Sequence, residues 1–147
     1  MTCNKALDES VLRETAAFLS EYASLLSGCG ATCIRIEKNT RRLADAFRVG
    51  FDISIMPTHV YVSVWADNPA EAVVTVPKTI ACGISFNLNA KLSRLSWEVS
   101  DNSLGLAAAT ERFEQIRKTK STRKWETLFL TSLANASFCR LFGGDEI

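Results

Sequence analysis

The sequence predicts an α+β domain: a three-stranded antiparallel meander covered by helices, with about five helices in all. Short segments with alternating apolar residues occur between residues 51 and 76, whereas longer segments before and after them repeat apolar residues every three or four positions. Only short turns separate the alternating segments, which favours antiparallel neighbours. Strands confined to one region, with helices on both sides, are typical of an α+β fold.

The first helix is expected over residues 8–27. Its apolar face is wider than one stripe and consists of two adjacent rows: Val11, Thr15, Phe18, Tyr22 and Leu25, and then Leu12, Ala16, Leu19, Ala23 and Leu26. A face this wide predicts a helix that several other elements bury. We expect Asp8 to cap its start, Gly28 to cap its end, and Gly30 to keep the next turn open.

The second helix is expected from about Thr32 to Arg48. At about 100° per residue, one stripe faces the core: Cys33, Ile36, Thr40, Leu43, Ala44 and Phe47. Its polar residues lie on two flanks: Arg35, Asn39 and Arg42 on one, and Glu37, Arg41 and Arg48 on the other. Arg35 and Glu37 point about 200° apart and therefore do not neutralise each other. Glu37 and Arg41 form a favourable i, i+4 pair, and the sequence leaves open whether the other charges meet solvent, another element or another chain.

Three strands and two more helices follow. Alternating residues predict strands over Phe51–Met56, Val60–Trp65 and Ala72–Val76, with a turn at Pro57-Thr58-His59 and another at residues 66–69. Apolar rows at helical spacing predict a third helix after Gly83 and a fourth from near Gly105: Leu88, Leu92, Leu95 and Val99 in the third, and Ala109, Phe113 and Ile116 in the fourth.

The C-terminal segment combines charge with apolar residues. Five cations lie within eight residues: Arg117, Lys118, Lys120, Arg123 and Lys124. Trp125 and an uncharged stretch over residues 127–139 follow, but 13 residues are fewer than the roughly 20 that span a bilayer. A basic flank and an edge tryptophan suit a membrane surface with the basic side cytoplasmic. A soluble helix packed on the domain is the alternative.

Composition excludes several function classes. The 147 residues fit one domain. A net charge of +1 gives no indication that the protein binds nucleic acid or an acidic substrate. The first residues lack a basic-then-apolar signal pattern, so we expect an unsecreted protein with reduced thiols. We interpret the five cysteines as small buried apolar residues. The single histidine, His59, and the absence of a CxxC pair give no support to a metal site, and no cofactor is expected.

Several of these segments together resemble the N-terminal region of the threonine/serine exporter family, which includes a split succinate-exporter subunit. The resemblance rests on Gly30-Ala31, then Arg35-Ile36-Glu37 and Arg42, on the strand Ile53–Thr58 that ends in Pro57-Thr58, and on Val60–Val64. Trp125 before an apolar helix, and Phe142-Gly143-Gly144-Asp145 after it, are similar to the family's entry into its membrane part. The chain departs from the family pattern at Cys33, where the family often has threonine; here Thr32 lies one place earlier.

The resemblance implies a role and a location. Residues 1–122 would be a cytoplasmic α+β domain and residues 123–147 an apolar helix at the start of the membrane domain, on the cytoplasmic face of the bacterial inner membrane. Family members continue into further transmembrane helices, so the expected partner is the protein's own membrane part or a separate transmembrane subunit. A homo-oligomer, and a soluble state of the isolated chain, stay open.

The function expected from the resemblance is assembly or gating in an exporter of small amino acids or dicarboxylates. The family-motif residues that would contact substrate or partner are Gly30, Thr32, Arg35, Glu37, Arg42, Pro57 and Thr58. Arginines suit carboxylates because guanidinium groups bind them with two hydrogen bonds. A purely structural role, tying helix to sheet, is the alternative for Arg35, Glu37 and Arg42.

Two other functions compete with export. The first is a soluble, stand-alone dimerisation or ligand-sensing domain. The second is a hydrolase-like enzyme, which would need His59 beside Cys33 or Thr32 as the base for a nucleophile. Nothing in the spacing brings these residues together, so we expect a protein that is not an enzyme and has no catalytic residues. Nucleic acid is not an expected partner.

Overall fold

The computed structural model describes residues 2–80, 82–118 and 124–143. The elements follow in this order: α1 (Thr2–Gly28), α2 (Cys33–Ala46), β1 (Gly50–Ile55), β2 (Val60–Trp65), the 3-10 helix η1 (Pro69–Glu71), β3 (Val73–Thr75), α3 (Phe86–Asn102), α4 (Leu106–Lys118) and α5 (Lys124–Leu141). Within the described residues there are five α-helices and one antiparallel sheet in the order β1-β2-β3. The predicted α+β meander is confirmed.

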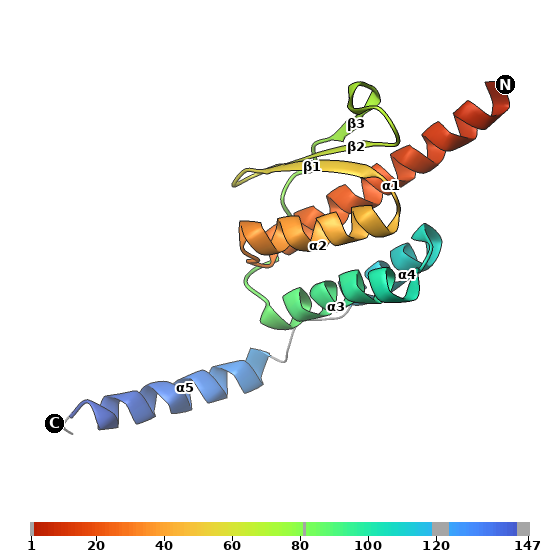
Figure 1. The fold of residues 1–147 in the computed structure, drawn as a ribbon. Coiled ribbons are helices and arrows are strands. Elements are labelled where there is room, and N and C mark those ends of the chain that lie inside the picture. Colours follow the sequence, from red (N-terminus) through yellow and green to blue (C-terminus); the bar gives the residue numbers. More distant parts are fainter. Residues whose placement is uncertain (1, 81, 119–123, 144–147) are drawn as a thin grey trace.

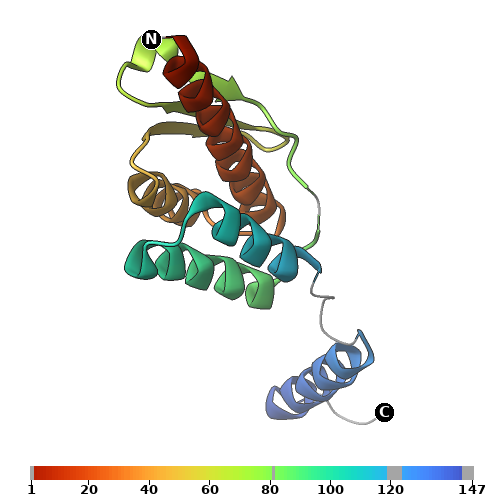
Figure 2. The same ribbon diagram turned by 90° about the vertical axis from the view of Figure 1, so that its right-hand side faces the viewer.

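The body of the protein has three layers, which Figures 1 and 2 show from two sides. The sheet lies on one side, α1 and α2 form the middle layer, and α3 and α4 cover the other side. Helix α1 contacts both outer layers, and its Leu19, Tyr22 and Leu26 side chains are completely buried. The two-row apolar face predicted this position correctly, except for Val11, which is 52% exposed beyond the reach of the neighbouring elements.

The ends of α1 differ from the prediction. The helix begins at Thr2, so Asp8 lies within it and does not cap it. Gly28 is its last residue, and the left-handed residue that ends it is Gly30, with φ of 82°. The amide of Gly30 donates to the carbonyl of Ser27, and that of Ala31 to Leu26, both at 3.1 Å. This is the Schellman arrangement, and it satisfies carbonyls that the helix end leaves free.

The second helix ends in the same way without a glycine. Arg48 adopts a φ of 58°, its amide donates to Asp45, and the amide of Val49 donates to Ala44. The predicted core stripe of α2 is buried at Ile36, Thr40, Leu43 and Ala44, and Phe47 packs partly buried against the core. Cys33 is exposed, because it lies in the first turn, beyond the area that the other layers cover.

The register of the sheet places its apolar residues on the face toward the helices. Phe51 pairs with Val64, Ile53 with Val62 and Ile55 with Val60. The alternation of these residues therefore predicted the buried face correctly, since side chains of paired residues share a face. β3 covers only Val73–Thr75, three residues of the five predicted.

The interpretation of the five cysteines as buried residues is confirmed for one and wrong for three, and the side chain of Cys3 lies outside the described part of the chain. Cys29 is buried, but Cys33, Cys82 and Cys139 are exposed free thiols. Cys33 and Cys82 lie at or beside turns and Cys139 lies on α5, which explains their exposure despite the apolar character of cysteine.

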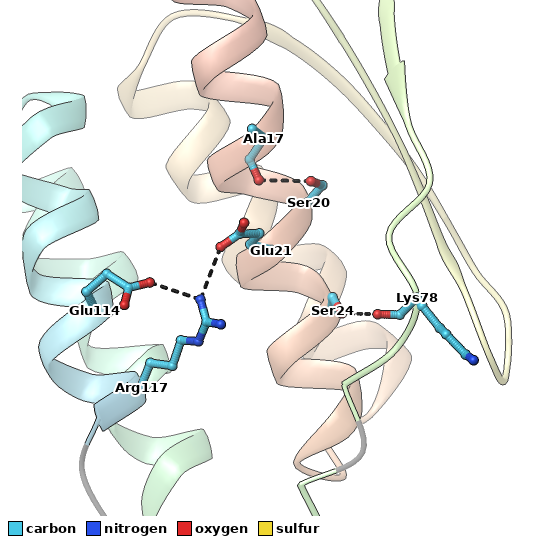
Figure 3. A network of polar contacts seen from close by, with 7 residues as sticks. All are labelled: Ala17, Ser20, Glu21, Ser24, Lys78, Glu114 and Arg117. Carbon is cyan, nitrogen blue, oxygen red and sulfur yellow. Dashed lines mark hydrogen bonds and ion pairs between the residues drawn. The ribbon is translucent and has the colours of Figure 1, made fainter.

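Polar contacts attach the last layer and the sheet to α1, as Figure 3 shows. The Arg117 guanidinium of α4 lies 3.6 Å from the Glu21 carboxylate of α1 and 3.0 Å from Glu114. On the other side of α1, the Ser24 hydroxyl donates to the backbone carbonyl of Lys78 at 2.8 Å. Exposed ion pairs of this kind contribute at most about 1 kcal/mol, so apolar burial holds the layers together and these contacts orient them.

Helix α5 lies apart from the three layers in both views (Figures 1 and 2). Every side chain of α5 that the structure describes is exposed. The described residues thus show no packing of this helix on the domain. None of the helices, within the described ranges, has the length and apolarity to cross a membrane. Lys120, Arg123, Gly144 and Asp145, which belong to the predicted basic cluster and family motif, lie outside the described residues.

The close approach of residue 80 to α1 gives a prediction about Gly28. A Cβ atom at Gly28 would overlap the backbone carbonyl of Ile80, whereas one at Gly105 would meet nothing within 4 Å. We expect Gly28→Ala to lower the free energy of unfolding by about 2–3 kcal/mol, because backbone has to move. Gly105→Ala is the matched control and should leave the thermal midpoint unchanged or slightly raised. Equal midpoints for the two variants would contradict this packing.

Candidate functional site

Helices α2 and α3 run in parallel and are joined by a row of polar side chains, which we call the α2–α3 seam. It consists of three hydrogen bonds: Arg35 Nη1 to Asn89 Oδ1 at 3.2 Å, Asn39 Nδ2 to Ser93 Oγ at 2.8 Å, and Arg42 Nη1 to Ser96 Oγ at 2.8 Å. Donor and acceptor are 54 residues apart in each pair. The offset repeats because both helices present residues at the same i, i+4, i+7 spacing.

Arg42 is the residue with the most contacts in the seam. Its Nη1 also donates to Asn39 Oδ1 at 3.0 Å, and its Cζ lies 3.6 Å from the centre of the Trp97 ring. A guanidinium over an aromatic face contributes about 0.5–2 kcal/mol, more when it is desolvated. In the described part of the chain, neither Arg35 nor Arg42 forms an ion pair. The seam therefore holds two positive charges with neutral partners.

The inner side of the seam rests on Tyr22 of α1. The phenol is fully buried and donates to the carbonyl of Leu92 at 2.9 Å. Burial raises the pKa of Tyr22 far above its ordinary value, although hydrogen bonding to Ser96 and the charge of Arg42 act in the opposite direction. The phenol consequently stays protonated near neutral pH and acts as a fixed hydrogen-bond donor.

The other predicted site residues lie elsewhere. Thr32 is the N-cap of α2 and accepts from the Arg35 amide, at 3.4 Å. Glu37 pairs with Arg41 at 3.2 Å, as its spacing predicted, with both side chains half exposed. Pro57 and Thr58 are exposed in the turn between β1 and β2. The structure thus brings Arg35 and Arg42 together with Asn39 and leaves the remaining motif residues outside the seam.

The sequence was also compared with models of known protein families. Residues 17–147 match the model described as "Putative threonine/serine exporter" (ThrE). The chain belongs to this family. The family is one of membrane exporters and not of enzymes, so the predicted resemblance is confirmed, and the matched range contains the whole seam. Searches of curated proteins and of solved structures gave no match.

The chain contains seam residues that the sequence analysis missed. They all lie on α3: Asn89, Ser93, Ser96 and Trp97. Asn89 and Ser96 are buried, each beside a leucine of the apolar row that predicted this helix. Polar residues at positions 89, 93 and 96 repeat the spacing of Arg35, Asn39 and Arg42, and that match is the signal that was available.

The candidate nucleophiles Cys33 and Thr32 have no base in contact with them among the described residues. The His59 Nδ1 atom lies 2.9 Å from the Thr58 hydroxyl, and its backbone pairs with Lys78. Neither Cys33 nor Thr32 is among these contacts. Burial raises the pKa of the Cys29 thiol to about 11, so the buried cysteine is also a poor nucleophile at neutral pH. No group of three metal-ligating side chains occurs within the described ranges.

The seam predicts a large effect of one arginine on stability. Arg42→Ala removes two hydrogen bonds and the stack on Trp97, and it leaves the Ser96 hydroxyl and Asn39 without their charged donor. We expect the free energy of unfolding to fall by about 1–3 kcal/mol. Lys38→Ala, an exposed cation on the same helix, should change it by less than about 0.5 kcal/mol. Chemical denaturation of both variants measures the difference; similar losses would contradict the seam.

Proposed function

We propose that this chain supplies the cytoplasmic N-terminal domain of a membrane exporter of small amino acids or dicarboxylates, of threonine/serine or succinate type. Residues 1–122 are the domain, and residues 123–147 begin the membrane part. The observation that carries the proposal is the uncovered surface of α5. Its exposed large apolar residues, together with Phe142 directly after it, are Trp125, Leu128, Phe129, Leu130, Leu133, Phe138, Leu141 and Phe142.

These side chains lie around the whole helix and not on one face. A helix that is apolar on all sides belongs inside a helix bundle or a membrane. Each side chain of this size contributes about 1.5–3 kcal/mol when it is fully buried, so leaving all of them in water is unfavourable. Small residues between them, such as Ala134, Ala136 and Ser137, suit close packing of helices in lipid.

The flanks of α5 support an orientation with the domain in the cytoplasm. Arg117 and Lys118 form the last turn of α4, and Trp125 follows at the start of α5. Cations next to an apolar helix favour the cytoplasmic side, and tryptophan favours the interface between lipid and water. We infer that α5 packs with transmembrane helices of the same protein or of a separate subunit, at the cytoplasmic face of the inner membrane.

The seam supports a role of this domain in assembly or gating. Its hydrogen bonds make α2 and α3 one rigid pair, which transmits a displacement at one helix to the other. Arg35 and Arg42 each use one nitrogen, Nη1, in the hydrogen bonds of the seam, and a guanidinium has five N–H donors. The remaining donors are available to a carboxylate of a partner subunit or of a transported substrate.

The proposal predicts that α5 anchors the chain. The 147-residue chain should float with vesicles of phosphatidylethanolamine and phosphatidylglycerol. A Leu130→Lys, Leu133→Lys double variant should bind at least tenfold less, because each lysine costs about 2.5–3.5 kcal/mol inside a membrane. Val74→Lys is the control, since Val74 is 60% exposed on β3. A wild-type chain that stays in the supernatant would exclude the anchor.

Export assays distinguish a direct role of Arg35 and Arg42 in transport from a purely structural role. In cells that carry the complete exporter, we expect Arg35→Ala and Arg42→Ala to abolish efflux of threonine, serine or succinate while the protein remains folded and inserted. Ser96→Ala removes one seam bond and keeps both guanidinium groups. If Ser96→Ala and Arg42→Ala lose export to the same extent, the arginines have only a structural role.

A further inference from the structure

A second apolar surface lies at the end of the domain where α2 and α3 begin. Ile34, Ile84 and Phe86 are 67%, 78% and 82% exposed, and we call them the α2/α3 patch. The segment with Ile84 and Phe86 contacts the turn that leads into α2, because the Ser85 amide donates to the Cys29 carbonyl at 3.1 Å and a Cβ atom at Gly30 would lie 3.1 Å from Ile84.

Single exposed apolar residues are normal on a protein surface, but three large ones at one end are less common. Two of them, Ile84 and Phe86, flank Ser85, which caps α3 by accepting from the Leu88 amide. The cap and the Ser85–Cys29 hydrogen bond fix the backbone of this segment. Its outward side chains are therefore presented by an ordered turn.

Charges at this end are segregated by sign. The first twelve residues of α3 contain Lys91 and Arg94 and no acid, whereas Glu98 and Asp101 lie toward its other end. This order opposes the helix dipole, which favours acids at the start and cations at the end. The first turn of α2 also lacks an acid and contains Arg35. The positive ends of two parallel helices and their cations thus face the same way.

Helix α4 adds to this positive end. It lies antiparallel to α3 (Figure 2), so its last turn, with Lys118, lies near the start of α3. Lys91 and Arg94 line a shallow groove between the two helices together with Arg112, and Glu98 is the one acid in its lining. Among the described residues that line the groove, the cations outnumber the acid, and Glu98 lies toward the end of α3 that is away from the patch, so the arrangement attracts anions.

We propose that the α2/α3 patch docks on the surface of an anionic lipid bilayer. Ile34, Ile84 and Phe86 enter the interface, while Lys91, Arg94 and Lys118 face lipid phosphates. Separate apolar side chains among cations suit a fluid interface that adapts to them, and each cation near such a surface contributes about 1 kcal/mol. The proposal rests on the membrane location in the proposed function and adds which face of the domain meets the membrane.

The chain path agrees with this orientation. The last turn of α4, from which the chain continues toward α5, is at the patch end of the domain, while the start of α1 is at the opposite end (Figures 1 and 2). An anchor that follows α4 would therefore bring the α2/α3 patch, and not the sheet, toward the bilayer.

Photo-crosslinking in the full chain tests the contact at one residue. Phe86 is replaced by p-benzoylphenylalanine, which preserves an aromatic side chain, and the same replacement is made at Val74 on β3 and at Phe138 on α5. With phosphatidylglycerol-containing vesicles we expect lipid adducts at positions 86 and 138 and none at 74. Lys91→Glu with Arg94→Glu should reduce the adduct at 86 several-fold and leave that at 138 unchanged. Thermal unfolding of each variant verifies the fold.

Each outcome of the experiment supports or overturns the docking. Lipid adducts at 138 but not at 86 would overturn the docking and keep the proposed function. Absence of lipid adducts at both positions would overturn the membrane anchor as well. An adduct between position 86 and a second copy of the chain, independent of vesicles, would show that the patch is a protein interface. An adduct at 86 that is equally strong with phosphatidylcholine would exclude the anionic preference.

Discussion

The structure depends on the burial of α1 between two layers. Leu19, Tyr22 and Leu26 are completely buried, and each contributes about 1.5–3 kcal/mol relative to an exposed side chain. Tyr22 also fixes how α3 is positioned against α1, because its buried hydroxyl needs a hydrogen-bond partner in an apolar environment. Its bond to the Leu92 carbonyl holds α3 at one position against α1. With α3 placed there, the polar flank of α2 meets the polar residues of α3.

The α2–α3 seam forms as a consequence of that placement. It contains two positive charges whose hydrogen-bond partners are neutral. Hydrogen bonds to charged groups contribute about 1.5–3 kcal/mol, so Arg35 and Arg42 stabilise the helix pair through amide and hydroxyl partners. The arginines are not neutralised by these partners, and their positive potential remains at the surface. A structural tie and a site for carboxylates are therefore compatible in the same two residues. We propose the second role because the chain belongs to the threonine/serine exporter family.

The net charge of the chain is close to zero, but basic and acidic residues are unevenly distributed in this domain. The chain has 17 basic and 16 acidic residues, yet α3 separates Lys91 and Arg94 from Glu98 and Asp101. Parallel packing with α2 then adds a second positive helix end on the same side. Exposed apolar residues occur at that end and along α5. Charge and apolarity together give the domain one end that suits a membrane, although its composition is close to neutral.

The sequence by itself determined the elements whose signals are local. The double apolar row of the first helix, the alternation of the strands and the Glu37–Arg41 spacing all predicted what the structure shows, because periodicity depends only on neighbours along the chain. Gly30 was assigned to the correct turn, and the structure moved the left-handed cap from Gly28 to it.

The tertiary structure alone decided which faces meet. Periodicity shows that a helix has a polar flank, but it does not show what that flank contacts. The partners of Arg35 and Arg42 lie 54 residues away, and their choice depends on how three layers stack around α1. The exposure of Cys33 and Cys82 was decided in the same way, because it depends on where the covering layers end and not on the residue type.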